Sequence, residues 1–434
     1  MNRVAIVGAG WAGLAAAASL ATRGIATHVF EAARHLGGRA RRVEIEGVAL
    51  DNGQHILIGA YRETLRMMGE VGVDPDRALL RRPLELRLAS GFRMKAPRWP
   101  APLHLAGALA GARGITVREK LAALRFVGNL RRARYRLKVD CTVDDFLLRY
   151  GQPDAVRAKL WQPLCVAALN TPSSTASAQV FANVLRDTFE GDREASDLLL
   201  PRSDLGALFP EAAAAYVRNR SGEVSLGAPV RALARGRDGD WIVEGLGPFA
   251  AVIIACAPLH AATLVGTLEP LAPLAAELST LRFEPIYTCY LQYPEAISLP
   301  FPMIGFEAGP VHWAFDRGEL SGHRGLMAAV TSASGPHEDE DHSGFTRMAH
   351  DALSSLLPGL PQPRWARVIA ERRATFACTP GLRRPSNETT VDGLFLAGDY
   401  TASDYPGTLE SAIRSGVRAA TLAAHSLSRA STHA

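Results

Sequence analysis

The stretch VAIVGAGWAGLAAAASLATRG, residues 4–24, decides the fold of this chain. Residues 4–7 are an apolar run typical of a buried parallel strand, and the alanine-rich segment from Leu14 is typical of a helix. Gly8, Gly10 and Gly13 lie between them in the GxGxxG spacing of a dinucleotide-binding turn. In such a turn the first glycine allows the tight bend, the second lets backbone approach a pyrophosphate, and the third permits close helix packing. The free N–H groups at the start of the helix would face the phosphates.

An acidic residue at the end of the next expected strand supports this interpretation. The segment THVFEA, residues 27–32, carries Glu31, 18 residues after Gly13. This is close to the position of the acid that binds a ribose hydroxyl in dinucleotide-binding folds, and an acid there disfavours a 2′-phosphate. The alternative is a glycine turn that binds no ligand. Such a turn would not require a preceding strand, a following helix and an acidic residue, and all three occur here. The residues therefore predict a Rossmann-like α/β domain that binds FAD or NAD.

The segment HLGGRARR, residues 35–42, distinguishes between these two cofactors. It places Gly37, Gly38 and Arg39 after the second strand, and it resembles the double-glycine motif of flavoproteins with two dinucleotide-binding domains. That resemblance implies FAD. From the residues alone, the segment is equally explained as a solvated basic turn, since Arg41 and Arg42 add charge that a phosphate does not require.

A second strand–loop–helix unit lies near the other end of the chain, in GLFLAGDYTASDYPGTLESAIRSGVRAA, residues 393–420. Together the two units resemble the flavin-containing amine oxidase and carotenoid desaturase superfamily. This resemblance implies a fold similar to amine oxidases and phytoene desaturases, in which a Rossmann-like FAD-binding domain carries an inserted α+β substrate domain. It also implies cofactor contacts: the ribityl or pyrophosphate region at Gly398 and Asp399, the flavin pyrimidine at Thr408 and Leu409, and the adenine at Val230 within SGEVSLGAPVRAL.

The stretch LDNGQHILIGAY, residues 50–61, places several polar groups beside an apolar run. The same resemblance implies that Asn52, Gly53 and Gln54 lie against the isoalloxazine ring, with His55 beside them. The alternative is an ordinary capped corner after a strand, because Asn-Gly is common in turns.

Length and composition predict the organisation of the chain and its partners. At 434 residues with 47% hydrophobic residues, two domains are expected. We assign residues 1–84, 216–261 and 373–434 to the FAD-binding domain, and residues 85–215 and 262–372 to the substrate-binding domain. The net charge of +5 favours anionic partners. No motif typical of nucleic-acid binding occurs, so no nucleic-acid partner is expected.

Other patterns predict the compartment of the protein. The five cysteines are dispersed and form no CxxC, which is typical of reduced thiols and not of a disulfide or metal framework. Neither a signal peptide nor an apolar run of transmembrane length is found. The piece VREKLAALRFVGNLRRARYRLK, residues 117–138, has eight Arg or Lys and helical spacing of its apolar residues. Such a basic amphipathic helix can lie on an anionic membrane, and a solvated helix packed on its own core fits equally well. We expect a cytoplasmic protein that contacts the inner face of the cell membrane through residues 100–138.

Four stretches from the middle of the chain narrow the resemblance to one branch of the superfamily: WQPLCVAALNTP (161–172), LLLPRSDLGALFP (198–210), HWAFDR (312–317) and RRATFACTPGLRRP (372–385). They resemble the squalene-associated FAD-dependent enzymes, the hydroxysqualene dehydroxylases. This implies a lipophilic isoprenoid substrate, reductive loss of a hydroxyl from hydroxysqualene to give squalene for hopanoids, and an electron donor that the sequence does not identify.

Loss of a hydroxyl needs a proton donor, and our candidates for the catalytic acid are His55, Asp316 and Tyr405. Each is also explained as a structural hydrogen-bonding residue. An amine oxidase would need an aromatic residue after the turn at Tyr405, Pro406 and Gly407, and Thr408 stands there instead. A carotenoid-type desaturase shares the apolar substrate and differs in redox direction, and an FAD-binding regulatory protein is a third possibility. We expect non-covalent FAD, with neither Cys378 nor His55 attached to it.

Overall fold

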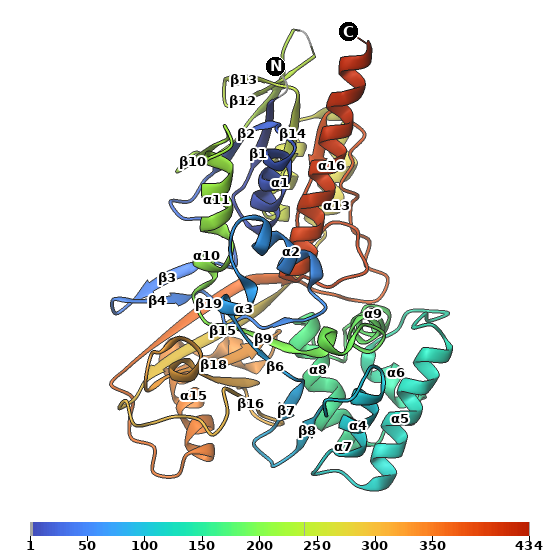
Figure 1. Cartoon of the computed structure of the whole chain (residues 1–434), viewed down its shortest axis with the longest axis vertical. Coiled ribbons are helices and arrows are strands. Elements are labelled where there is room, and N and C mark those ends of the chain that lie inside the picture. Colours follow the sequence, from blue (N-terminus) through green and yellow to red (C-terminus); the bar gives the residue numbers. More distant parts are fainter. Residues whose placement is uncertain (1–2, 238, 434) are drawn as a thin grey trace.

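The computed structural model describes residues 3–237 and 239–433, and of residues 430–433 the backbone alone. The upper half of the molecule in Figure 1 is built on a parallel sheet with the strand order β10-β2-β1-β14-β20. The predicted α/β class with a parallel sheet at the N-terminal glycine turn is confirmed. All five strands lie in the three segments expected to bind the cofactor: β1 Arg3–Val7, β2 Ala26–Glu31, β10 Glu223–Leu226, β14 Ala251–Ile254 and β20 Leu394–Leu396.

Alternate side chains of β1 enter two different hydrophobic cores. Val4 and Ile6 pack with the helices that cover one face of the sheet, whereas Ala5 and Val7 belong to the core on the other face. Successive side chains of a strand point to opposite faces, so a strand covered on both faces is apolar throughout. The elements that cover the two faces are α1 Trp11–Thr22, α11 Pro210–Arg218 and α16 Leu409–His433 on the first, and α12 Pro258–Val265, α13 Ala272–Ser279, β11 Leu233–Arg235, β12 Trp241–Val243 and β13 Leu246–Phe249 on the second.

Two long antiparallel strands connect this half to the lower half of Figure 1. They are β15 (Phe283–Gln292) and β19 (Trp365–Phe376), which pair along their length and complete a sheet of order β16-β17-β18-β15-β19. Phe345 and Leu353 of α15 pack on one face of this sheet. The remaining bounds in this region are β16 Met303–Gly305, β17 Trp313–Asp316, α14 Arg317–Ser321, β18 Leu326–Ser332 and α15 His342–Leu356.

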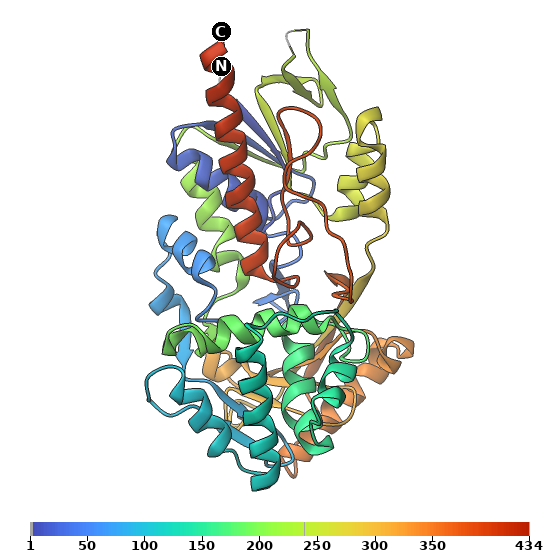
Figure 2. The same cartoon turned by 90° about the vertical axis from the view of Figure 1, so that its right-hand side faces the viewer.

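Helices form the rest of the lower half, in front of this sheet in Figure 2. The piece 117–138, expected to be helical, forms α5 (Val117–Arg132), and α4 (Leu103–Ala110) precedes it. Gly114, with φ of +85°, separates them, and Arg134 and Tyr135 at φ of 50° and 55° end the second. The other elements here are β7 Glu85–Arg87, β8 Arg93–Lys95, α6 Val143–Arg149, α7 Asp154–Val156, a π-helical turn Arg157–Trp161, α8 Gln162–Leu169 and α9 Ala178–Phe189.

Short elements lie where the two halves meet. The polar stretch after Leu50 begins at the last residue of β4 and forms the loop before β5, so its side chains lie at the junction of the halves. The bounds of these elements are β3 Arg42–Ile45, β4 Val48–Asp51, β5 Leu57–Ile58, α2 Arg62–Glu70, α3 Pro75–Ala78, β6 Leu79–Arg82, β9 Leu198–Pro201 and α10 Leu205–Leu208.

Candidate functional site

The glycine turn between β1 and α1 has the geometry of a phosphate-binding loop. Gly8 has φ of +111°, and its N–H donates to the carbonyl of Phe30 at 2.7 Å. A Cβ atom on Gly13 would lie 2.0 Å from the Gly8 carbonyl oxygen, so only glycine fits where the helix crosses the strand. No side chain caps the N-terminus of α1. Its first N–H groups therefore remain available to an anion.

Gly10 differs from Gly8 and Gly13, because a side chain at this position would point into free space. A Cβ atom there would meet no protein atom within 4 Å. Gly37 donates its N–H to the carbonyl of Ala9 at 2.9 Å, and the position of a Cβ on Gly38 lies 3.3 Å from the Cα of Gly10. The double-glycine segment thus packs directly on the glycine turn between β1 and α1. The free space beside Gly10 would allow a pyrophosphate to approach the backbone closely.

Glu31 lies at the end of β2, beside this turn. Its carboxylate accepts the N–H groups of Ala9 at 2.7 Å and Ala33 at 2.8 Å. Val230, predicted to contact the adenine, lies in the loop between β10 and β11. The neighbouring Ala228 donates its N–H to the Glu31 carbonyl at 2.8 Å, which holds this loop beside the strand end. The two residues predicted to contact the adenosine are thereby placed on adjacent segments.

The unit β20–α16 brings a second set of predicted residues to the same region. Gly398, at φ of +157°, follows β20, and its N–H donates to the Ser415 hydroxyl at 2.9 Å. The buried Asp399 forms an ion pair with Arg39. Burial lowers the pKa of the Arg39 guanidinium and the Asp399 charge raises it, with a net rise. Two residues separately predicted to contact the cofactor therefore hold each other.

Two charged residues fix the start of α16. Arg384 donates to the carbonyls of Asp399 at 3.4 Å and Tyr405 at 2.9 Å, which ties down the loop before the helix. The fully buried Glu410 accepts hydrogen bonds from the Thr64 backbone at 2.8 Å and from its hydroxyl at 2.7 Å. These contacts place Thr408 and the first turn of the helix at the junction of the two halves.

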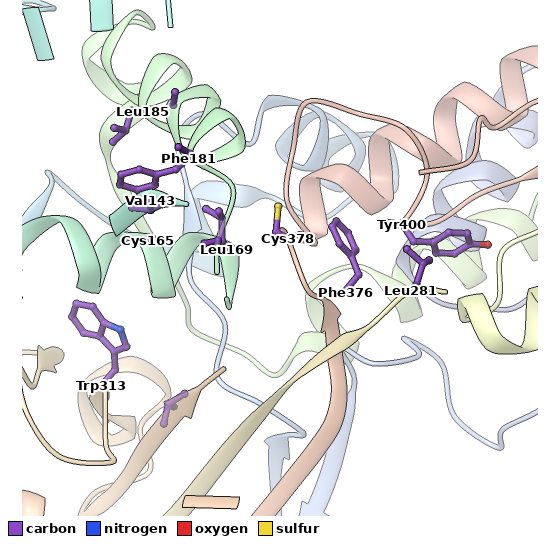
Figure 3. Close-up of a cluster of buried hydrophobic side chains, with 14 of the residues drawn as sticks. Val143, Cys165, Leu169, Phe181, Leu185, Leu281, Trp313, Phe376, Cys378 and Tyr400 are labelled. Carbon is purple, nitrogen blue, oxygen red and sulfur yellow. The ribbon is translucent and has the colours of Figure 1, made fainter. Parts of the chain in front are cut away.

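A mainly apolar cavity begins at this junction and extends into the helical part of the lower half. Figure 3 shows Phe181 and Leu185 on α9 and Trp313 on β17, three of the residues that line it. Glu85 also lines it, and its carboxylate pairs with Arg87 at 2.7 Å. Other apolar lining residues are Ile56, Ile58, Leu84, Leu86, Met94, Leu105, Leu109, Leu160, Leu164 and Met303.

Ionisable side chains concentrate at the end of the cavity nearest α16. Tyr61, Asp187 and Tyr405 line this end together with Thr408. Burial raises the pKa of Tyr405 to about 12; the hydrogen bond from its hydroxyl to Asp187 adds to the shift and Arg414 opposes it. The guanidinium carbon of Arg414 lies 4.7 Å from the centre of the Tyr405 ring. Burial likewise raises the pKa of Tyr61, whose hydroxyl is hydrogen-bonded to Thr408.

Comparison with known proteins identifies the family. Residues 11–424 match the family described as flavin containing amine oxidoreductase. The chain belongs to this family. It is 29% identical to a hydroxysqualene dehydroxylase of Rhodopseudomonas palustris, over 96% of this chain and 97% of that protein. A zeta-carotene desaturase of Capsicum annuum is 22% identical, over 96% of this chain and 80% of that protein. The solved structure of an oxidoreductase from Methanosarcina mazei superimposes with a TM-score of 0.73 at 15% identity, over 96% and 99% of the two chains.

Membership of the flavin-containing amine oxidoreductase family makes the chain an FAD-dependent oxidoreductase. The structure fits this cofactor, because the open space at Gly10 and the uncapped N-terminus of α1 suit a pyrophosphate. Glu31 would hold the ribose, and the start of α16 would face the flavin. The complete set predicted to hold FAD is Gly8, Gly10, Gly13, Glu31, Gly38, Arg39, Asn52, Gly53, Gln54, Val230, Gly398, Asp399, Thr408 and Leu409.

The three predicted acids have different surroundings. Asp316 caps α14 and accepts N–H groups from Leu299 at 2.8 Å, Gly318 at 2.8 Å and Glu319 at 3.1 Å. Both of its carboxylate oxygens are occupied, and it is not among the residues that line the cavity. These are the contacts of a helix cap, and we do not retain Asp316 as a proposed acid.

His55 also lacks the features of an acid. Burial lowers the pKa of its imidazole, and the Gly53 carbonyl at 2.7 Å from Nδ1 opposes that shift. A carbonyl can only accept, so Nδ1 carries a proton that is already bonded to the Gly53 carbonyl. Of the three candidates, Tyr405 alone lines the cavity.

Sequence reasoning missed Tyr61 and Asp187. Tyr61 closes the LDNGQHILIGAY stretch, and this position was the available signal. Asp187 lies near the end of α9 between Arg186 and Thr188, where nothing in the local sequence marks it.

Proposed function

We propose that this oxidoreductase removes the hydroxyl of hydroxysqualene by reduction and releases squalene, a step of hopanoid synthesis. The observation that supports this most is the distribution of polarity in the cavity. Its walls are mainly apolar, with Glu85 paired to Arg87 and Arg93 as a further charged lining residue, and Tyr61, Asp187 and Tyr405 line it together with Thr408 beside α16. Such a cavity suits a long hydrocarbon with one reactive hydroxyl. The resemblance over nearly the full length to a hydroxysqualene dehydroxylase supports the same substrate.

In this proposal Tyr405 is the catalytic acid. Its raised pKa, about 12, keeps the phenol protonated at neutral pH. In this step the Tyr405 hydroxyl turns from Asp187 to the substrate, and donation of its proton to the substrate hydroxyl breaks the C–O bond and releases water. An allylic cation is left in the cavity. Arg414, 4.7 Å from the ring centre, stabilises the resulting phenolate. Asp187, part-exposed and paired with Arg186 at 2.8 Å, can return a proton from solvent to the phenol.

The remaining residues protect the cation and keep it in position. The face of the Tyr61 ring is electron-rich and attracts a cation. Apolar walls such as Ile56 and Trp313 exclude water that would recapture the cation as alcohol. Reduced FAD, when bound, supplies the hydride that completes the exchange of hydroxyl for hydrogen. A separate electron donor, which the residues of this chain do not identify, must reduce FAD again before the next turnover.

A carotenoid-type desaturase is the second candidate, supported by the resemblance to a zeta-carotene desaturase. The two activities run in opposite redox directions, so the oxidation state of FAD that reacts distinguishes them. We expect reduced protein to be reoxidised by hydroxysqualene and oxidised protein to be unchanged by phytoene. The absorbance of oxidised flavin reports both reactions. Reduction of the flavin by phytoene, with no reaction of hydroxysqualene, would support the desaturase and contradict our proposal.

We further propose that the protein takes this substrate from an anionic membrane through α4 and α5. The two helices and the segment before α4 expose four large apolar side chains, Trp99, Leu103, Val117 and Leu121, with 47–71% of each accessible. The opposite side of α4 carries Leu105 and Leu109, which line the cavity. No helix in the described part of the chain is long and apolar enough to cross a bilayer, so this contact would be interfacial. Exposed arginines neighbour these residues in the sequence, namely Arg98, Arg113, Arg118 and Arg125.

Flotation with lipid vesicles tests the membrane contact. We expect the protein to float with vesicles of phosphatidylcholine and phosphatidylglycerol, and less with phosphatidylcholine alone or at high salt. A Leu103→Asp/Val117→Asp variant should lose tenfold or more of this partitioning, because each buried aliphatic side chain contributes about 1.5–3 kcal/mol. Leu246→Asp is the matched control, since Leu246 is 51% exposed on β13 in the other half of the molecule. Equal flotation of both variants would contradict the assignment.

A further inference from the structure

Arg317 is a fully buried charge that the proposed reaction does not use. It begins α14, directly after β17, and its side chain is 1% exposed. Its Nη1 donates to Oε1 of Gln54 at 3.0 Å, and its Nη2 lies 4.0 Å from Oδ2 of Asp51. Its Nε has no partner among the described residues. A guanidinium with so few contacts in the interior is costly, so its position calls for an explanation.

Arg317 contacts the loop of residues 51–55, and the other contacts that hold this loop involve Asp51 and Asn52. Leu205 donates its N–H to Oδ1 of Asp51 at 2.6 Å, and the Tyr290 hydroxyl donates to the Asp51 carbonyl at 3.0 Å. Arg41 donates its N–H to Oδ1 of Asn52 at 3.2 Å. The side chain of Gln54 has no such anchor apart from Arg317, because its other contact is a 3.5 Å bond to the His55 carbonyl.

The chemistry of a guanidinium determines which way the Gln54 amide faces. A guanidinium can only donate, so the amide oxygen must face Arg317 and the NH₂ group must face away from it. Burial raises the pKa of Asp51 to about 7 while Arg317 lowers it, so Asp51 is an incomplete counter-ion near neutral pH. This leaves the Gln54 oxygen as the closest acceptor for Arg317.

Unpaired polar atoms gather around the same loop. Among the described residues, Oδ2 of Asp51, Nε of Arg317 and Oγ1 of Thr288 are buried without a hydrogen-bond partner. Thr288 Oγ1 lies 4.0 Å from the position of a Cβ on Gly53. Buried polar groups are nearly always paired, so this concentration indicates a polar ligand at the loop.

We propose that Arg317 is a positioning residue that locks the Gln54 amide, so that its NH₂ group donates to a ring acceptor of FAD. This rests on the proposed function as a flavin-dependent reduction, and on the placement of Asn52, Gly53 and Gln54 against the isoalloxazine ring that the family resemblance implies. The ring gains negative charge on reduction, so a fixed donor stabilises reduced FAD more than oxidised FAD. Arg317 and Gln54 would thus favour the state that the proposed reaction needs.

The midpoint potential of bound FAD tests this without any substrate. We expect Gln54→Leu and Arg317→Met each to lower the potential by about 30 mV or more. For a two-electron reduction this equals at least a tenfold loss of affinity for reduced FAD relative to oxidised FAD. Gln54→Glu should lower it too, while its new carboxylate pairs with Arg317 and preserves the thermal stability. Glu319→Gln, on the same helix and paired with Arg82 at the surface, is the control and should leave the potential unchanged.

The Gln54 variants keep the test decisive even where Arg317→Met fails to fold. Unchanged potentials in Gln54→Leu and Gln54→Glu with FAD bound would overturn the proposal. A lowered potential in both, together with no squalene from the unmodified protein, would uphold the Gln54 donor and reject the substrate instead, whereas an unchanged potential in folded Arg317→Met would overturn the positioning role of Arg317.

Discussion

Replacing Tyr405 with Phe is expected to slow the reoxidation of reduced FAD by hydroxysqualene by about 10²–10⁴-fold, the range that a positioned general acid contributes. The substitution removes one oxygen and keeps the ring beside Arg414. FAD content and thermal stability should therefore stay close to those of the unmodified protein. Stopped-flow absorbance under exclusion of oxygen measures the rate.

Two further substitutions separate Tyr405 from its neighbours. Asp187→Asn should slow the reaction less, because Asp187 returns the proton to the phenol and does not touch the substrate in our account. Tyr61→Phe keeps the ring face that attracts the cation and should have the smallest effect. Normal turnover of Tyr405→Phe would contradict the assignment of Tyr405 as the acid, and Tyr405 is the only one of the three predicted acids that lines the cavity.

Gly10→Ala is expected to raise the dissociation constant for FAD by about 100-fold or more, or about 2.7 kcal/mol, without destabilising the apoprotein. The added methyl group meets no protein atom within 4 Å, and Gly10 already has a φ of −74° that alanine adopts readily. It would, however, occupy the space that the pyrophosphate approaches. Flavin fluorescence titration and thermal unfolding of the apoprotein measure the two quantities.

Gly13→Ala is the matched comparison for Gly10→Ala. Its added methyl group would lie 2.0 Å from the Gly8 carbonyl, so the apoprotein itself should be destabilised. Equal loss of apoprotein stability in the two variants, or unchanged FAD affinity in Gly10→Ala, would show that the space at Gly10 is not the phosphate site.

The parts of this protein that the sequence predicted well depend on local backbone requirements. Gly8 is required by the tight turn after β1, and Gly13 is required where α1 crosses this strand. Both requirements are local, so the spacing of these glycines points to the fold. The apolar runs of β1 and β20 were recognised in the same way, since short apolar runs are typical of buried parallel strands.

The parts that the sequence did not predict depend on partners far apart in the chain. HWAFDR suggested Asp316 as an acid, but the N–H groups that surround it, including that of Leu299, are apparent only in the folded structure. Arg39 and Asp399 lie 360 positions apart, and nothing in either motif indicates that they pair. Arg317 belongs to a motif that we noted for its composition, while its partner Gln54 lies 263 positions away.

A single turnover under exclusion of oxygen tests the proposed reaction most directly. The purified protein is reduced chemically, excess reductant is removed, and hydroxysqualene is added in detergent micelles. We predict that the absorbance of oxidised flavin returns and that mass spectrometry finds one squalene for each flavin reoxidised. Persistently reduced flavin without squalene, in protein shown to bind FAD, would contradict the assignment of hydroxysqualene as the substrate.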